Sequence, residues 1–144
     1  MALTVQITFD AHDPAALAEF WALALGYELE PPPAGFQTWE EALDAWGVPA
    51  GDRNRASALR DPAGHGPRVF IQRVPEDKTA KNRLHLDLRA AEGIPREERM
   101  AALEQRAQTL VDAGATRVSR HEPDRLGQGH IVMQDPEGNE FCLD

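Results

Sequence analysis

The chain ends with "DPEGNEFCLD" at residues 135–144, and a similar stretch, "DPAGHGPRVFIQ", occupies residues 61–72. Asp-Pro-x-Gly is a turn signal, because Pro presets the backbone of a turn and Gly tolerates a left-handed conformation. A short apolar run follows the turn in both places, as expected of a strand. The same turn is therefore used twice, each time before a strand, and this indicates two related halves.

Each half begins with a segment in which apolar and polar residues alternate. The first is "LTVQITFD" at residues 3–10, and the second is "LHLDLR" at residues 84–89. A period of two predicts a strand that has one face on a core and the other in polar surroundings. We expect the leucines of the second segment to pack on helices and its polar side chains to face a cavity. These residues are Leu84, Leu86 and Leu88 on one face, and His85 and Asp87 on the other.

A helix is predicted after each alternating segment. In the first half, Asp13 suits the N-cap, Pro14 suits the first helical position, and the helix should end near Leu25. In the second half, a helix is expected between Pro95 and Gly114. Further strands are predicted at about 27–30, 55–60, 68–74, 115–121, 129–134 and 139–143. Each half thus predicts the order strand, helix, strand, strand, strand.

Only the first half contains an insertion, at residues 31–54. Within it, Thr38 and Glu41 have the spacing of a capping box and predict a short helix that ends before Gly47. Two interpretations of Trp39 and Trp46 stay open, because they can close over an apolar ligand or form the packing face of the helix. The insertion is a candidate lid or rim.

The composition excludes several classes of function. The 144 residues carry a net charge of −9 and have no basic run, so we expect neither nucleic acid nor an anionic membrane as a partner. No apolar stretch approaches the roughly 18 residues that span a membrane, and a cytoplasmic location is expected. The single cysteine, Cys142, excludes a disulfide within the chain.

This organisation resembles the vicinal oxygen chelate superfamily, which includes glyoxalases, bleomycin resistance proteins and extradiol dioxygenases, and in particular its glyoxalase-like branch. The segments that carry the resemblance are "ITFDAHDPAALAEFWALALGYE" at 7–28, "RDPAGHGPRVFIQRVPE" at 60–76, "NRLHLDL" at 82–88 and "DPEGNEFCL" at 135–143. The resemblance implies an α+β fold in one domain, 1–144, with βαβββ modules at about 1–76 and 82–144. Their mixed sheets should curl around a shared cavity, and a homodimer is expected.

The resemblance also implies where a metal would bind in the enzymes of the superfamily. The first-strand positions of the two modules fall on Gln6 and His85, and the last-strand positions fall on Gln72 and Cys142. Only His85 is a residue that the metal-binding members normally use. Mg²⁺, Mn²⁺ and Fe²⁺ favour carboxylate and imidazole donors, so we expect no cofactor of this kind and no metal at these four positions.

Two alternatives to this expectation stay open. Cys142 and His85 are residue types that bind zinc. Asp87 should share a strand face with His85, and Glu140 with Cys142, so a displaced acidic site is also conceivable. A divalent metal therefore stays open as a second hypothesis.

Polar residues on the predicted cavity faces are the candidate ligand-binding residues, and His85 is the candidate catalytic residue. The binding set is Gln6, Thr8, Asp10, Phe70, Gln72, His85, Asp87, Glu140 and Cys142. Structural interpretations compete with these roles: Gln6 and Gln72 can hydrogen-bond each other, and Cys142 can be a small buried hydrophobic residue. The histidines near turns and strand ends, His121 and His130 among them, are interpreted as solvated.

These observations favour a glyoxalase-like protein that binds a small molecule in its cavity, whether or not it is an enzyme. A metal-dependent lyase, isomerase or dioxygenase is the first alternative. A drug-sequestering protein, like the bleomycin resistance members, is the second. No Gly-rich phosphate loop, Ser-His-Asp order or Cys-x-x-Cys pair supports another class.

Overall fold

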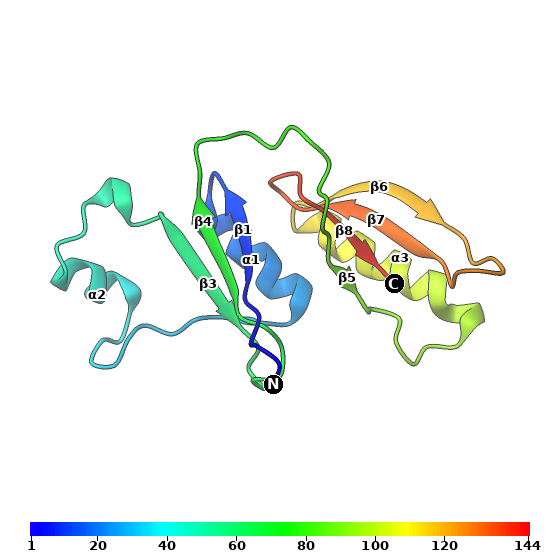
Figure 1. Ribbon diagram of the computed structural model, residues 1–144, viewed down its shortest axis with the longest axis horizontal. Helices are drawn as coiled ribbons and strands as arrows, with labels where there is room; N and C mark the ends of the chain where they lie inside the picture. The colour runs from blue at the N-terminus through cyan, green and yellow to red at the C-terminus, as the bar shows by residue number, and fades with distance from the viewer. The chain divides into compact units, whose positions relative to one another are not determined.

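The computed structural model describes all residues from 1 to 144 and divides into two compact units, Met1–Glu76 and Asp77–Asp144. Both units have the order strand, helix, strand, strand, strand (Figure 1). The first contains β1 (Ile7–Ala11), α1 (Pro14–Leu25), β2 (Glu28–Leu29), α2 (Trp39–Ala45), a 3₁₀ helix (Ala50–Asp52), β3 (Ala56–Arg60) and β4 (Val69–Arg73). The second contains β5 (Asp87–Leu88), α3 (Arg96–Asp112), β6 (Thr116–His121), β7 (His130–Gln134) and β8 (Glu140–Leu143). None of the helices has the length and apolar character that a membrane crossing requires.

The two sheets have the same topology. The strand order is β1-β4-β3-β2 in the first sheet and β5-β8-β7-β6 in the second. In each, the first and last strands pair in parallel and the remaining pairs are antiparallel. The α+β fold of two tandem βαβββ modules is therefore confirmed, whereas a cavity shared between the modules stays a prediction.

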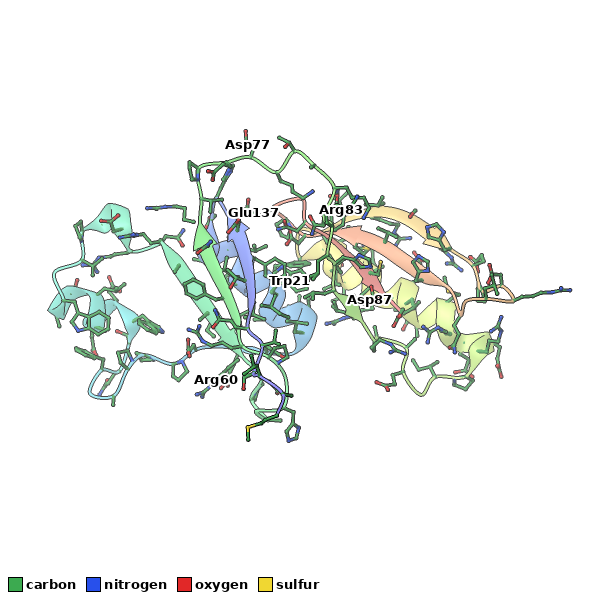
Figure 2. All side chains as sticks on the ribbon, in the orientation of Figure 1. Trp21, Arg60, Asp77, Arg83, Asp87 and Glu137 are labelled. Carbon is green, nitrogen blue, oxygen red and sulfur yellow. The ribbon has the colours of Figure 1, made fainter.

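The helix α1 covers one face of the first sheet and forms its core. Trp21, labelled in Figure 2, is completely buried and stacks on Phe9 of β1 with 4.8 Å between ring centroids. Side chains from the sheet that face α1, such as Ile71, are also completely buried. The opposite face of the sheet is left for polar residues. In the second unit, α3 packs in the same way on β6, β7 and β8.

The predicted helix signals are confirmed. The Asp13 carboxylate accepts a hydrogen bond from the Ala16 N–H at 3.2 Å, as an N-cap does. Gly26 ends α1 in the left-handed conformation, with φ of 70°. In the insertion, the Thr38 hydroxyl accepts from the Glu41 N–H at 3.1 Å, whereas the Glu41 carboxylate accepts from Gln37. Only one arm of the predicted capping box is therefore formed.

The Asp-Pro-x-Gly turns have the same construction in both units. The Asp61 carboxylate accepts hydrogen bonds from the backbone N–H groups of Ala63 and Gly66 at 2.9 and 2.8 Å. The Asp135 carboxylate likewise accepts from Glu137 and Asn139 at 2.9 and 3.0 Å. The aspartate thus satisfies the donors that a tight turn leaves unpaired, and this explains why it occurs in both turns.

Both first strands are shorter than the alternation predicts. β1 begins at Ile7 rather than at residue 3, because its partner β4 begins at Val69, the residue that pairs with Ile7. β5 is limited to two residues, since only Asp87 and Leu88 of this segment pair with β8. As a result Leu84 is 76% exposed, and the prediction that it packs on a helix is wrong. Of the three leucines, only Leu88 is buried.

Candidate functional site

A pocket of about 380 Å³ opens on the polar face of the second sheet. Its wall combines side chains from β5 and β8 with side chains from α3 and from the residues that lead into β7. The lining residues are His85, Asp87, Arg89, Arg99, Gln128, Gly129, His130, Cys142 and Asp144. Three of the predicted site residues therefore lie on the wall of one pocket.

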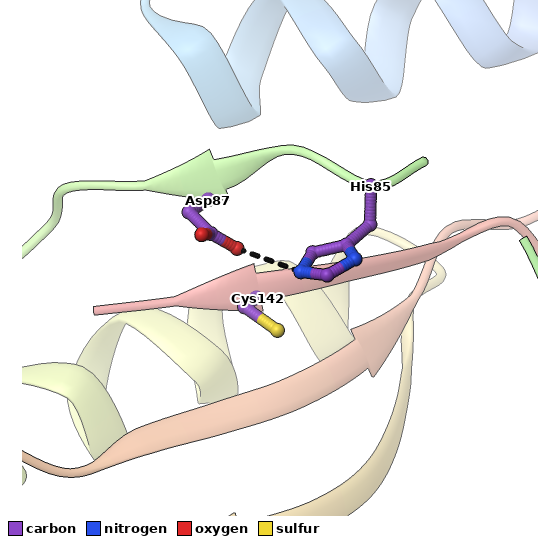
Figure 3. Close-up of side chains that lie close together, drawn as sticks. All are labelled: His85, Asp87 and Cys142. Atoms are coloured by element: carbon purple, nitrogen blue, oxygen red, sulfur yellow. Dashed lines mark ion pairs between the residues drawn. The ribbon is translucent and has the colours of Figure 1, made fainter. Parts of the chain in front are cut away.

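The three residues converge because of the register between β5 and β8. Asp87 pairs directly with Cys142, and the neighbours of Cys142 on β8, Phe141 and Leu143, turn into the core. His85 lies two residues before Asp87, and its Nε2 is 3.1 Å from the Asp87 Oδ1 (Figure 3). One ligand atom from each of His85, Asp87 and Cys142 lies within 4.8 Å of the others.

The surroundings of Cys142 keep its thiol protonated. Burial raises the pKa of the thiol to about 11, together with the charge of Asp87, a hydrogen bond to Asp87 and the charge of Asp144. At neutral pH only a very small fraction of the side chain is the nucleophilic thiolate. A role for Cys142 as an unassisted nucleophile is therefore disfavoured.

Glu140 lies on the same face of β8 but has other partners. Its Oε2 is 3.1 Å from the Lys78 ammonium and accepts a hydrogen bond from the Asn82 N–H at 3.0 Å. Burial raises the pKa of the carboxyl, but the Asn82 and Lys78 interactions outweigh it and lower the pKa to about 2. Glu140 thus holds the segment that precedes β5, and Asp87 is the carboxylate beside His85.

The candidate residues of the first unit form a separate polar row. Asp10 and Gln72 pair across β1 and β4, and the Gln72 amide donates to the Asp10 carboxylate at 2.8 Å. Gln6 lies at the other end of the row and accepts a hydrogen bond from Arg68 at 2.7 Å. The hypothesis that Gln6 and Gln72 bond each other is therefore wrong, since they lie at opposite ends of the paired strands.

Thr8 and Phe70 pair between these two ends, and Phe70 adjoins a second pocket. This first-unit pocket has a volume of about 330 Å³ and a mostly apolar wall. It is lined by Ala15, Leu29, Glu30, Trp39, Leu43, Arg53, Asn54, Ala56, Ser57, Ala58, Arg68 and Phe70. The insertion contributes Trp39 and Leu43 from α2, so it forms a rim, and the Trp39 indole donates to the Glu30 carbonyl at 2.7 Å.

Several residues of the second-unit pocket were not predicted from the sequence. His130, interpreted above as solvated, lines the pocket and stacks on His121 with 4.5 Å between ring centroids. Arg99 is a buried residue of α3, where an Arg among acidic residues suggests a solvated helix face. The alternation of β7 carries a signal for His130, because Ile131 and Met133 face the core and His130 faces the other way.

The arrangement of His85, Asp87 and Cys142 permits two kinds of chemistry. A carboxylate 3.1 Å from one imidazole nitrogen fixes the orientation of the ring, as in acid-base catalysis. An imidazole, a carboxylate and a thiol are also a donor set that suits Zn²⁺ better than Mg²⁺ or Mn²⁺. Both depend on the same three side chains.

Comparison with solved structures shows the same fold in other proteins. A hypothetical protein from S. aureus is 14% identical, with a TM-score of 0.60 over 99% of this chain and 96% of that chain. A glyoxalase/bleomycin resistance protein/dioxygenase family enzyme from Burkholderia phytofirmans is 15% identical, with a TM-score of 0.60 over 96% and 94%. The fosfomycin resistance protein FosX from Listeria monocytogenes, solved with Mn(II) and 1S,2S-dihydroxypropylphosphonic acid, is 12% identical, with a TM-score of 0.62 over 99% and 89%.

No curated protein sequence matches the chain. A family profile described as "Glyoxalase-like domain" matches residues 6–143, which is nearly the whole chain. This match and the shared fold support the resemblance noted from the sequence. The chain belongs to the glyoxalase-like domain family, within the vicinal oxygen chelate superfamily.

Proposed function

We propose that the protein binds a small molecule in the pocket of the second unit and that His85 is the principal polar group that contacts it. The observation that carries this proposal is the His85–Asp87 pair, 3.1 Å apart, on the wall of a pocket of about 380 Å³. His85 also occupies the first-strand position at which the superfamily places a functional residue. A pocket of this size accommodates a small organic ligand.

Asp87 gives His85 a defined role in this proposal. Its carboxylate lies 3.1 Å from Nε2 of the ring, so the other nitrogen is available for an oxygen atom of the ligand. If the protein is an enzyme, His85 transfers a proton to or from that oxygen, and Asp87 stabilises the imidazolium. If it is a binding protein, the same nitrogen provides a hydrogen bond.

The test is an NMR screen of a small-molecule library against ¹⁵N-labelled protein. Hits that shift pocket resonances should lose most of their affinity in His85→Ala. The matched control is His65→Ala, because His65 is an exposed histidine in the turn of the other unit. Hits that bind His85→Ala and His65→Ala equally well would overturn the assignment of His85.

A divalent metal is a second candidate, favoured by the convergence of three ligand atoms within 4.8 Å. His85, Asp87 and Cys142 would hold the ion, and their nitrogen, oxygen and sulfur donors fit Zn²⁺ with one position open for a ligand. A bound metal would supply a Lewis acid that polarises an oxygen of the ligand. The Listeria FosX structure was solved with Mn(II), which supports a metal only in general terms. In this chain the possible ligands His85, Asp87 and Cys142 include a thiol, which a hard ion such as Mn²⁺ does not favour.

Elemental analysis and calorimetric titration separate these two candidates. We expect no stoichiometric Fe, Mn, Ni or Mg in the isolated protein, and tighter binding of Zn²⁺ than of Mn²⁺ if either binds. Zn²⁺ binding that survives in both His85→Ala and Cys142→Ser would exclude this metal site. Ligand binding that persists in EDTA would favour the metal-free proposal.

The homodimer expected from the superfamily also stays a proposal. Light scattering at micromolar concentration should give twice the mass of one chain. A mass of 15.9 kDa, that of a single chain, would contradict it.

A further inference from the structure

Arg99, near the start of α3, is the only buried basic residue of the protein. It is 6% exposed, and the only other buried charged residue is Asp135. Removing a charge from water is costly unless an opposite charge or several hydrogen bonds compensate for it. The partners of Arg99 therefore indicate the role of its positive charge.

The hydrogen bonds of Arg99 satisfy only part of its guanidinium. Nε donates to the Gln128 carbonyl at 3.2 Å, and Nη1 donates to the Ala91 carbonyl at 3.3 Å. Both acceptors are neutral, and Nη2 makes no hydrogen bond within the protein. A guanidinium has five N–H donors in a planar fork, so the Nη1 and Nη2 end keeps donors for another group.

The carboxylates of the same pocket already face other partners. Asp144 Oδ1 is 2.6 Å from Arg89 Nε, and Asp87 Oδ1 is 3.1 Å from His85 Nε2. Arg99 lines this pocket without a carboxylate of its own. Arg99 is thus a buried cation that forms no ion pair within the protein, although Asp87 and Asp144 line the same pocket.

We propose that the ligand of this pocket carries a carboxylate that pairs with Arg99; this rests on the proposed function, that the pocket binds a small molecule. A carboxylate is planar and matches the two-pronged end of a guanidinium. A singly charged group fits better than a doubly charged phosphate, because Asp87 and Asp144 lie on the same wall and the whole chain carries a charge of −9. The substrate class is therefore a small monocarboxylate.

A purely structural role for Arg99 makes a different prediction. Its two hydrogen bonds join the segment after β5 to the segment before β7, so loss of the side chain could simply loosen both. In that case the stability of the protein would change, but the pocket would not prefer an acid to its neutral amide. The matched pair of benzoate and benzamide separates the two roles.

The experiment is an NMR titration of the full chain with benzoate and, separately, with benzamide. The Arg99 Nε–Hε signal and the backbone signals of Gly129 and Cys142 report on the pocket. Arg99→Gln removes the charge and keeps donors, Arg99→Lys keeps the charge, and thermal melts show whether each variant is folded. Arg96→Gln is the control, because Arg96 is an exposed residue one turn earlier on α3 that also donates to a backbone carbonyl, that of Asp124.

We expect benzoate to bind the wild type and Arg96→Gln roughly tenfold or more tightly than benzamide, as a charge-assisted hydrogen bond implies. Arg99→Gln should lose this preference, and Arg99→Lys should keep part of it. If Arg99→Gln does not fold, the wild-type preference and the Arg99→Lys result decide. Equal binding of benzoate and benzamide would overturn the proposal that the ligand carries a carboxylate, while leaving the pocket as a binding site. Absence of binding by both would also overturn it, and the library screen with His85→Ala would then test the pocket separately.

Discussion

Asp87 and Cys142 lie directly opposite each other on the parallel strands β5 and β8, and the Asp87 carboxylate accepts a hydrogen bond from the Cys142 thiol. Their proximity places a negative charge beside a group that would itself become negative on losing its proton. Together with burial, it raises the pKa of the thiol to about 11. The pair is therefore stable as a carboxylate and a thiol. A cation bound between them would instead favour the thiolate, because it would compensate the two negative charges.

Alkylation of Cys142 tests this relationship. In EDTA-treated protein at neutral pH, iodoacetamide should react roughly a hundredfold more slowly than with an ordinary thiol, because raising the pKa from 9.0 to about 11 lowers the thiolate fraction by that factor. The rate should rise with pH up to about pH 11. Asp87→Asn should speed the reaction at neutral pH. Mass spectrometry measures the alkylation rate of the wild type at neutral pH, its rise with pH, and the rate of the Asp87→Asn variant. A wild-type rate equal to that of free cysteine would contradict the assignment.

The carboxyl of Glu140 should make stability depend on pH in the acid range. Its pKa is lowered from 4.5 to about 2, so the carboxylate stabilises the folded state fully above the unfolded pKa near 4.5. This contribution is lost as the pH falls from about 4.5 toward 2. Glu140→Gln should therefore lower the free energy of unfolding at pH 7, and the difference from wild type should shrink below pH 4.5. Urea unfolding between pH 2 and pH 8 measures it.

Glu19→Gln is the control for this prediction, because Glu19 is an exposed residue of α1. Its difference from wild type should be small at every pH. A Glu140→Gln difference that stays constant from pH 7 to pH 2 would show that the Asn82 hydrogen bond and the Lys78 ion pair do not lower the pKa of the carboxyl.

Gly129 should be intolerant of any side chain. Its φ is +84°, and a Cβ there would lie 2.6 Å from the Met100 sulfur and 2.9 Å from the His121 carbonyl. Gly93 has a similar φ of +76°, but a Cβ there would meet no atom within 4 Å, so Gly93→Ala isolates the backbone strain of about 1–2 kcal/mol. Gly129→Ala should lose about 1–3 kcal/mol more, from overpacking. Equal losses in chemical denaturation would refute the clash.

The two turn aspartates, Asp61 and Asp135, should differ in how much they stabilise the folded protein. Asp135 is 2% exposed, and its carboxylate accepts two backbone N–H groups and the Asn139 amide. Asp135→Ala leaves buried donors unpaired and should lower the free energy of unfolding by about 1–3 kcal/mol. Asp61→Ala should cost less, because water can replace the carboxylate in the more exposed turn. Thermal melts of both variants give the comparison, and a larger loss for Asp61→Ala would be the contrary result.

The sequence predicted the fold well because its signals are local. The N-cap Asp13, the left-handed Gly26 and the repeated Asp-Pro-x-Gly turn act within a few residues of chain, and the structure contains all of them. The ends of strands depend instead on a partner that is distant in sequence. For this reason residues 3–6, which alternate as a strand should, lie outside β1.

The candidate site was predictable only in part, for the same reason. Alternation was enough to put His85 and Asp87 on one face, and the resemblance to a family added Cys142. The burial of Arg99 depends on two carbonyls, Ala91 from the segment after β5 and Gln128 from the segment before β7, and no local pattern indicates it. The partner of Glu140, Lys78, is likewise 62 residues away in the chain.

The position of the insertion has a consequence for how such a protein can evolve. Residues 31–54 lie in the first unit, where α2 contributes Trp39 and Leu43 to the apolar pocket. Every residue that lines the polar pocket belongs to the second unit. Natural variants can therefore lengthen, shorten or rewrite the insertion without altering the scaffold that carries His85, Asp87 and Cys142. The half that carries the candidate site can therefore stay unchanged while the insertion in the other half varies.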